Sequence, residues 1–214
     1  MRLTSSSFSA GTNINNFNDK NKNNRNQRFQ FFDLGSGGGR LVIQSHLEIP
    51  SVVKSVGIEL SPSRHAIAIQ TWQGLLLSGE AKRIRQLAEK AFGISSYDNN
   101  APPQVELHEG DLFLLDISEA THMYVSSLCF SENMLERLVD KIEREGTALQ
   151  TLASLRLLPL KNRKLKQKCD DSGTRKVELG SNPWMEFVEM SWTKARGDGC
   201  PVYFYSVKKL DQSE

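Results

Sequence analysis

From residue 29 onward, short apolar runs alternate with segments whose apolar positions recur at helical spacing. The short runs are rich in β-branched and aromatic residues, which is typical of buried strands. They predict strands at residues 29–34, 51–59, 104–108, 121–128 and 149–155. Strands that alternate with helices build mainly parallel sheets, so the pattern predicts an α/β fold.

Three segments between these strands have the spacing of helices. A short apolar helix is expected around residues 41–47, directly after a glycine-rich turn. A longer helix over residues 61–92 begins with a Ser-Pro pair, a typical helix start, and has bends expected at Gly74 or Gly79. Residues 131–146 form a third helix, which a serine begins and a glycine ends.

The two ends of the chain depart from this alternation. Apolar residues 186–192 and 201–207 are joined by a polar, glycine-containing segment, which predicts an antiparallel hairpin. Residues 1–28 are dominated by Ser and Asn and offer almost nothing to bury, so a disordered tail is predicted there. We therefore expect one folded domain over residues 29–214, with a mainly parallel sheet and an antiparallel C-terminal hairpin.

Composition narrows the class of protein without naming a function. The chain has 214 residues, 38% hydrophobic and 24% charged, which is ordinary for a soluble globular protein. No apolar run could span a bilayer, and the Ser-rich start lacks the apolar core of a secretory signal, although an organelle transit peptide stays open. Cys129, Cys169 and Cys200 show no zinc-ligand spacing, so we expect reduced thiols, no metal site and an intracellular protein.

The net charge is only +2, but the cations gather in two places. Residues 1–28 hold five cations and one acid. A second cluster has five cations within eight residues: Lys161, Arg163, Lys164, Lys166 and Lys168. Basic clusters of this kind fit nucleic acid or an acidic protein surface, and a solvated loop or tail is the alternative.

The glycine-rich turn after the first strand is the first feature that indicates chemistry. Its backbone, at Gly35, Ser36, Gly37 and Gly39, can approach a nucleotide-like ligand because few side chains are in the way. A dinucleotide site requires the spacing G-x-G-x-x-G, whereas the glycines here follow G-x-G-x-G. Asp33, just before the turn, would repel a pyrophosphate but suits the cationic amino-acid end of S-adenosylmethionine. The turn therefore favours S-adenosylmethionine over a dinucleotide.

Acidic residues follow the next two predicted strands. Glu59 ends the second strand, 20 residues after Gly39, and can accept hydrogen bonds from both hydroxyls of a ribose. Asp111 follows the third strand, where it can accept from an adenine amino group while Leu112 faces the ring. Ligands of open α/β sheets lie beyond the carboxyl ends of the strands. These residues are therefore expected to line one cofactor pocket together with the glycine-rich turn.

In the same order along the chain, these motifs resemble those of the non-SET, DOT-type (disruptor of telomeric silencing) histone-lysine methyltransferases. The matching motifs are DLGSG at 33–37, VGIE at 56–59 and GDL at 110–112. Residues 125–130 resemble that family's Asn-Asn-Phe-Ala-Phe loop. Residues 190–193 and 201–205 resemble its Val-Ser-Trp-Thr and Pro-Val-Ser-Tyr-Tyr segments. The resemblance covers roughly residues 29–208.

This resemblance implies a Rossmann-like class I methyltransferase sheet and S-adenosyl-L-methionine as the cofactor. It also implies a lysine channel lined by Ser126, Trp192 and Phe204, with Ser126 where the family has Asn and Phe204 where it has Tyr. Aromatic walls attract an incoming ammonium, and a dry channel lowers the pKa of a lysine by disfavouring its charged form. Because the motifs contain no strong general base, we expect the proton to be lost to solvent.

The expected function is therefore methyl transfer to a lysine of a histone in nucleosomes, by a nuclear protein. The basic tail and the cluster over residues 161–168 would contact nucleosomal DNA through its phosphates. Two alternatives stay open. One is a methyltransferase of another protein or of a small molecule, and the other is a catalytically silent module that binds S-adenosylmethionine. A cytoplasmic or organellar location is open as well.

Overall fold

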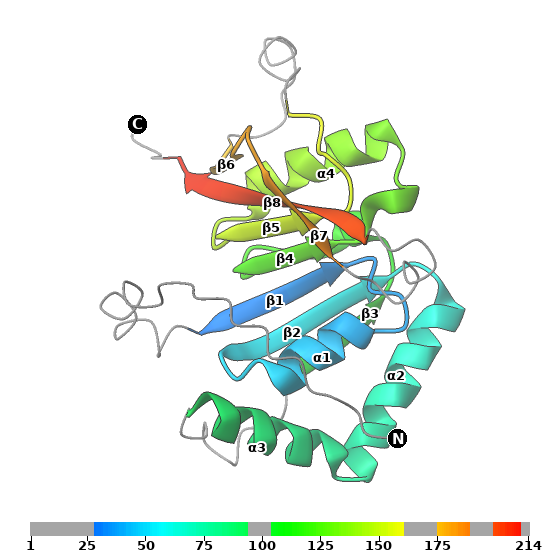
Figure 1. Cartoon of the computed structure of the whole chain (residues 1–214). Helices are drawn as coiled ribbons and strands as arrows, with labels where there is room; N and C mark the ends of the chain where they lie inside the picture. The colour runs from blue at the N-terminus through cyan, green and yellow to red at the C-terminus, as the bar shows by residue number, and fades with distance from the viewer. Residues whose placement is uncertain (1–27, 94–103, 161–174, 189–198, 211–214) are drawn as a thin grey trace, which may run out of the picture.

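The computed structural model describes residues 28–93, 104–160, 175–188 and 199–210 (Figure 1). Within these residues the strands are β1 Phe29–Leu34, β2 Val52–Glu59, β3 Gln104–Glu109, β4 His122–Val125, β5 Thr151–Ser154, β6 Val177–Leu179, β7 Trp184–Val188 and β8 Cys200–Lys209. The helices are α1 Arg40–Glu48, α2 Pro62–Leu77, α3 Glu80–Phe92 and α4 Glu132–Glu145, with short 3₁₀ turns η1 Leu112–Leu114 and η2 Ser127–Cys129. The predicted tail lies outside this part of the chain, apart from Arg28.

The strands form one mixed sheet with the order β3-β2-β1-β4-β5-β8-β6, and β7 also pairs with β8. Strands β1 to β5 are parallel, whereas β8 runs antiparallel to β5, β6 and β7. The predicted hairpin is confirmed as β7 and β8, whose pairing runs from Trp184 with Phe204 to Val188 with Cys200. Its first strand begins two residues earlier than predicted, and residues 189–192 lie outside the described residues. Strand β6 was not predicted.

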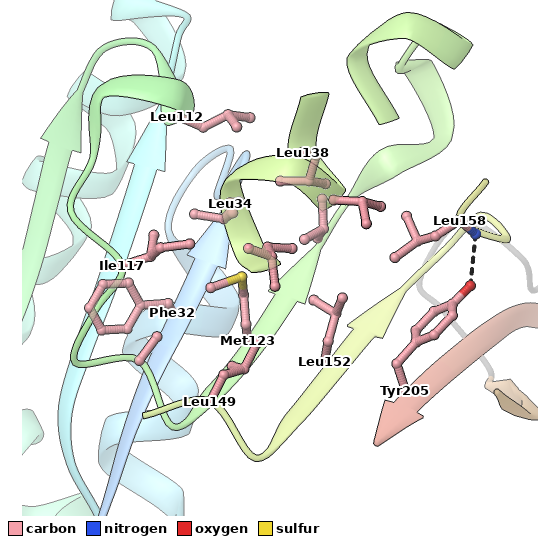
Figure 2. Packing of buried hydrophobic residues seen from close by; sticks show 14 of the residues in the cluster. Phe32, Leu34, Leu112, Ile117, Met123, Leu138, Leu149, Leu152, Leu158 and Tyr205 are labelled. Atoms are coloured by element: carbon pink, nitrogen blue, oxygen red, sulfur yellow. Dashed lines mark hydrogen bonds between the residues drawn. The ribbon is translucent and has the colours of Figure 1, made fainter. Parts of the chain in front are cut away.

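The two faces of the sheet bury different helices, because successive strand residues point to opposite sides. On one face, Val56 and Ile58 belong to the main core. Leu138, on the apolar side of α4, lies in the same core (Figure 2). On the other face, Gly57 lies under α1, and α1 packs with α2 and α3 in a second cluster. Tyr205 closes the main core, where its hydroxyl accepts the backbone N–H of Leu158 at 2.7 Å (Figure 2). None of the described helices is long and apolar enough to cross a membrane.

The long helical pattern over residues 61–92 becomes two helices, α2 and α3. The break falls at Gly79, which has a φ of 75°, in the left-handed region that few other residues adopt readily. Gly74, the other expected bend, lies inside α2. A left-handed glycine ends a helix because it turns the chain away from the helix axis. The break lets α3 turn back and pack against α1.

Gly57 allows α1 to lie close to β2. A Cβ atom at this position would lie 2.6 Å from Val42 Cγ2 and 2.9 Å from Ser36 Oγ. We expect Gly57→Ala to lower the free energy of unfolding by about 1–3 kcal/mol, measured by urea denaturation, because the closely packed helix must shift. Gly74→Ala is the matched control, since its Cβ would meet open space. It should leave stability unchanged or raise it by up to about 1 kcal/mol, and equal stability of both variants would contradict the prediction.

Candidate active site

The glycine-rich turn lies at the carboxyl edge of the sheet, directly after β1. Gly35, Gly37 and Gly39 have φ values of 86°, 56° and 72°, all in the left-handed region that glycine adopts without strain. The backbone N–H groups of Gly35 and Ser36 both donate to the carbonyl of Ile58 at 2.9 Å, which fastens the turn to β2. Among the described residues, apart from the chain neighbours of each glycine, no heavy atom lies within 4 Å of where a Cβ would stand on Gly35 or Gly37. The turn therefore offers exposed backbone to a ligand.

Glu59, at the end of β2, joins this turn to the start of α2. Its carboxylate is buried and accepts the N–H of Gly37 through Oε2 and the N–H of Ser61 through Oε1, each at 2.8 Å. Arg64 adds an ion pair to Oε1 at 3.1 Å, from a side chain that is 63% exposed. These bonds fix the carboxylate at the sheet edge. Oε2 keeps a second lone pair that can accept a ligand hydroxyl. Arg64 is exposed, so another ligand hydroxyl can displace it from Oε1.

Asp33 lies one residue before the end of β1 and is the least satisfied acid of the site. Its side chain is buried, and Oδ1 has no hydrogen-bond partner among the described residues. Burial, and then the nearby charge of Glu59, raise the pKa of Asp33 to about 7. A buried acceptor without a partner is unfavourable, and a bound cation would remove that cost. The unpartnered Oδ1 of Asp33, beside open glycine backbone, fits the ammonium of an amino-acid ligand.

The raised pKa of Asp33 makes stability depend on pH. The folded chain holds this proton up to about pH 7, whereas the unfolded chain loses it near the ordinary value of 3.8. The contribution of Asp33 to the free energy of unfolding should therefore fall as pH rises from 4 to 7. Burial, and then the charge of Arg85, lower the pKa of His46 to about 4, which gives the opposite slope below pH 6.5. Because these two slopes oppose each other, the contribution of Asp33 is measured as the difference in unfolding free energy between an Asp33 variant and the unmodified chain.

We therefore expect the stability of Asp33→Asn, relative to that of the unmodified chain, to increase as pH rises from 5 to 8. The asparagine cannot ionise, so it avoids the unfavourable burial of a charge at high pH. Urea unfolding of both proteins without ligand, at several pH values, measures the difference. Parallel pH curves would show that Asp33 does not carry this proton.

Asp111 and Leu112 follow β3 beside Glu59. The N–H of Gly110 donates to the backbone carbonyl of Glu59 at 3.0 Å, which brings the ends of β2 and β3 together. The exposed Asp111 carboxylate accepts the N–H of Phe113 at 2.9 Å and so begins the η1 turn. The side chain of Leu112 is buried in the main core. The predicted acidic residues at the ends of β1 and β2 and after β3 thus lie at one edge of the sheet. Asp111 already caps the N-terminus of η1.

The predicted acceptor residues lie farther along the same sheet. Ser126 follows β4, and the neighbouring Ser127 hydroxyl bonds to that of Ser154 at 2.8 Å, which holds this turn to the end of β5. Phe204 lies in β8 and stacks on Trp184 of β7, with ring centroids 4.3 Å apart and planes 13° from parallel. Trp192 lies outside the described residues, as do the five cations of the basic cluster. Trp184 was missed because it precedes the predicted strand.

One cross-strand row links the cofactor side to the acceptor side. Strand pairing aligns Asp33 with Tyr124, Tyr124 with Ala153, Ala153 with Phe204, and Phe204 with Trp184. Residues aligned in this way on neighbouring strands point to the same face of a sheet. Tyr124 therefore stands between the carboxylate of Asp33 and the aromatic stack. Tyr124 was not predicted as a site residue, although it lies two residues before Ser126 in a strand of alternating pattern.

The sheet order, the three left-handed glycines of the turn and the acids that end successive strands define a class I S-adenosylmethionine-dependent methyltransferase. S-adenosylmethionine is accordingly the cofactor. The chain belongs to the family of the histone methylation protein DOT1, whose family model matches residues 14–205. No curated protein sequence matches the chain.

Several solved structures are similar to this chain at low sequence identity. An RNA methyltransferase from Salinibacter ruber, in complex with S-adenosyl-L-homocysteine, is 21% identical over 87% of this chain and 83% of its own, with a TM-score of 0.42. TrmK from M. capricolum, in complex with S-adenosyl-homocysteine, is 11% identical over 88% and 67%, with a TM-score of 0.45. The methyltransferase domain of bacterial CtHen1 is 15% identical over 83% and 88%, with a TM-score of 0.44.

Proposed function

We propose that this chain is a protein-lysine N-methyltransferase whose substrate is a histone within nucleosomes. The match to the DOT1 family supports a histone substrate. The observation that carries the acceptor class is the stack of Phe204 on Trp184, in the same cross-strand row as Asp33. Aromatic faces attract an ammonium group. A lysine side chain is therefore the acceptor that this row suits best.

In this proposal the cofactor pocket follows the edge of the sheet. Asp33 receives the ammonium of the amino-acid end, Glu59 receives the ribose hydroxyls, and Asp111 with Leu112 borders the adenine. Backbone groups of the turn complete the pocket, at Gly35, Ser36, Gly37 and Gly39. The orphaned Oδ1 of Asp33 and the open backbone of the turn support this assignment.

The protein's main task in this reaction is alignment and desolvation. When bound, S-adenosylmethionine supplies a methyl group on a sulfonium, and the acceptor nitrogen takes it as the carbon–sulfur bond breaks with its electron pair left on sulfur. Phe204, Trp184 and Ser126 exclude water from the lysine in this proposal, and the family resemblance assigns Trp192 to the same channel. That exclusion lowers the pKa of the lysine and favours the neutral amine, whose proton leaves to solvent.

We also propose that the two basic clusters hold the enzyme on chromatin and that the protein is nuclear. The cations are Lys161, Arg163, Lys164, Lys166 and Lys168, together with those of residues 1–28. Cations that neutralise DNA phosphates release counterions, so affinity for nucleosomes should fall steeply as salt rises. Binding that barely changes between low and moderate salt would contradict this role.

Labelled S-adenosylmethionine distinguishes the candidate functions. The protein is incubated with nucleosomes, with free histones and with a cell extract, and the labelled residue is identified. Label on a histone lysine, strongest with nucleosomes, is the expected result. Transfer only to other proteins or to small molecules would replace the proposed substrate. Calorimetric binding of the cofactor with no transfer in any sample would indicate a silent module.

A further inference from the structure

Tyr124 is the member of the cross-strand row that stands between the two halves of the site. Neighbouring strands lie about 4.8 Å apart, so its backbone is about 5 Å from that of Asp33 and about 10 Å from that of Phe204. Ala153 fills the position between Tyr124 and Phe204 with only a methyl group. All three pack against the same buried cluster of Leu155, Cys200 and Val202. An unbranched alkyl chain that passes over Ala153 would therefore run between two aromatic rings.

The hydroxyl of Tyr124 distinguishes it from the other rings of the row. Phe204 has no polar atom, and Trp184 offers only an N–H donor. A hydrogen bond from the Ser126 side chain to the phenol oxygen acts to lower the pKa of Tyr124. Burial, and then the charge of Asp33, raise the pKa of Tyr124 to about 12, with Cys200 a further neighbour that acts in the same direction. The phenol thus stays protonated at neutral pH and serves as a hydrogen-bonding group.

We infer that the Tyr124 hydroxyl positions the acceptor amine for methyl transfer. The Ser126 side chain donates to the phenol oxygen, which keeps a second lone pair to accept an N–H of the substrate amine. This bond leaves the amine lone pair free to face the methyl group and directs the nitrogen to the end of the cofactor at Asp33. The assignment rests on the proposed function in one respect, because it takes the acceptor to be an amine on an alkyl chain. It adds a substrate-positioning residue to the channel.

Tyr124→Phe tests this role, because it removes the hydroxyl and keeps the ring. Two ligands are compared by calorimetry. One is S-adenosylhomocysteine. The other is its analogue with nitrogen in place of sulfur, carrying a 2-aminoethyl arm whose amine stands for the acceptor. The unmodified protein should bind the analogue more tightly than S-adenosylhomocysteine. Tyr124→Phe should bind the analogue about tenfold more weakly, as expected for one lost hydrogen bond, with unchanged affinity for S-adenosylhomocysteine.

Tyr203→Phe is the matched control, since it removes a phenol from the opposite face of β8, where Tyr203 packs against the main core. It should bind both ligands as the unmodified protein does. The inference is overturned if Tyr124→Phe binds the analogue normally, or if it weakens both ligands equally, which would mark a structural role. It is also overturned if the aminoethyl arm adds nothing to the affinity of the unmodified protein.

Methyl transfer then separates this inference from the proposed function. Where nucleosomes are methylated, Tyr124→Phe should lower kcat about tenfold and leave the KM for S-adenosylmethionine unchanged. If Tyr124→Phe weakens binding of the aminoethyl analogue but no histone is methylated, the positioning role of Tyr124 is supported and the proposed histone substrate is contradicted.

Discussion

Replacing Glu59 with alanine should weaken the binding of S-adenosylhomocysteine by at least about 100-fold. A carboxylate that accepts two ribose hydroxyls contributes roughly 1.5–3 kcal/mol for each charge-assisted bond. Glu59 also accepts the N–H groups of Gly37 and Ser61, each at 2.8 Å. Its loss therefore removes ligand bonds and releases the glycine-rich turn in one step. Calorimetric titration of the purified protein measures the change.

Two further variants make this prediction specific. Glu59→Gln keeps the shape and one acceptor oxygen, so it should lose about tenfold in affinity. Arg64→Ala removes the exposed partner of Glu59 but leaves both backbone bonds, and it should change the affinity by less than about threefold. Normal affinity in Glu59→Ala would show that the ribose lies elsewhere. An equal loss in all three variants would instead point to a general effect of the ion pair.

Replacing Arg85 with alanine should lower the free energy of unfolding by about 3–5 kcal/mol, a large fraction of a domain's usual total. The guanidinium of Arg85 reaches from α3 to the connection between α1 and β2. It donates to four backbone carbonyls there: His46, Ile49, Pro50 and Val52. Without it, the last carbonyls of α1 and the turn that follows lose their donor in a largely buried place.

Urea denaturation measures this loss, and Arg83→Ala supplies the control on the same helix. Arg83 pairs only with Glu80 among the bonds that the structure gives it, from a side chain that is 60% exposed. Its removal should leave the unfolding midpoint nearly unchanged. Arg85→Lys keeps the charge without the planar fork of donors, so it should recover less than half of the lost stability. A midpoint for Arg85→Ala close to that of Arg83→Ala would contradict the prediction.

The sequence predicted the parts of this fold that local patterns determine. Strands β1 to β5 follow from short apolar runs, aromatic in β1 and β-branched in β2. The Ser131 cap of α4 is confirmed by its bond to the N–H of Met134 at 3.3 Å. The glycine-rich turn was recognisable because only glycine readily adopts the φ values that Gly35, Gly37 and Gly39 have. The acids at the ends of β1, β2 and β3 could be located because parallel strands end at the same edge.

Features that depend on a distant partner were not predictable in this way. Strand β6 has three residues, and its pairing with β8 gives it a structure that its own composition does not indicate. The stack of Trp184 on Phe204 requires the register of the hairpin. The pattern placed Glu59 correctly at the end of β2, but it could not show that the protein's own backbone already occupies part of its carboxylate.

The place of β8 in the sheet also affects the order in which the chain can be assembled during its synthesis. Strands β6 and β7 leave the ribosome before β8, the strand that both of them pair with. Until β8 emerges, β5 is an open edge with unpaired backbone groups, and such edges readily pair with other chains. A nascent chain that ends before residue 200 thus carries an exposed sheet edge and two strands without partners. Translational pausing in this region would prolong the interval in which chaperones must protect it.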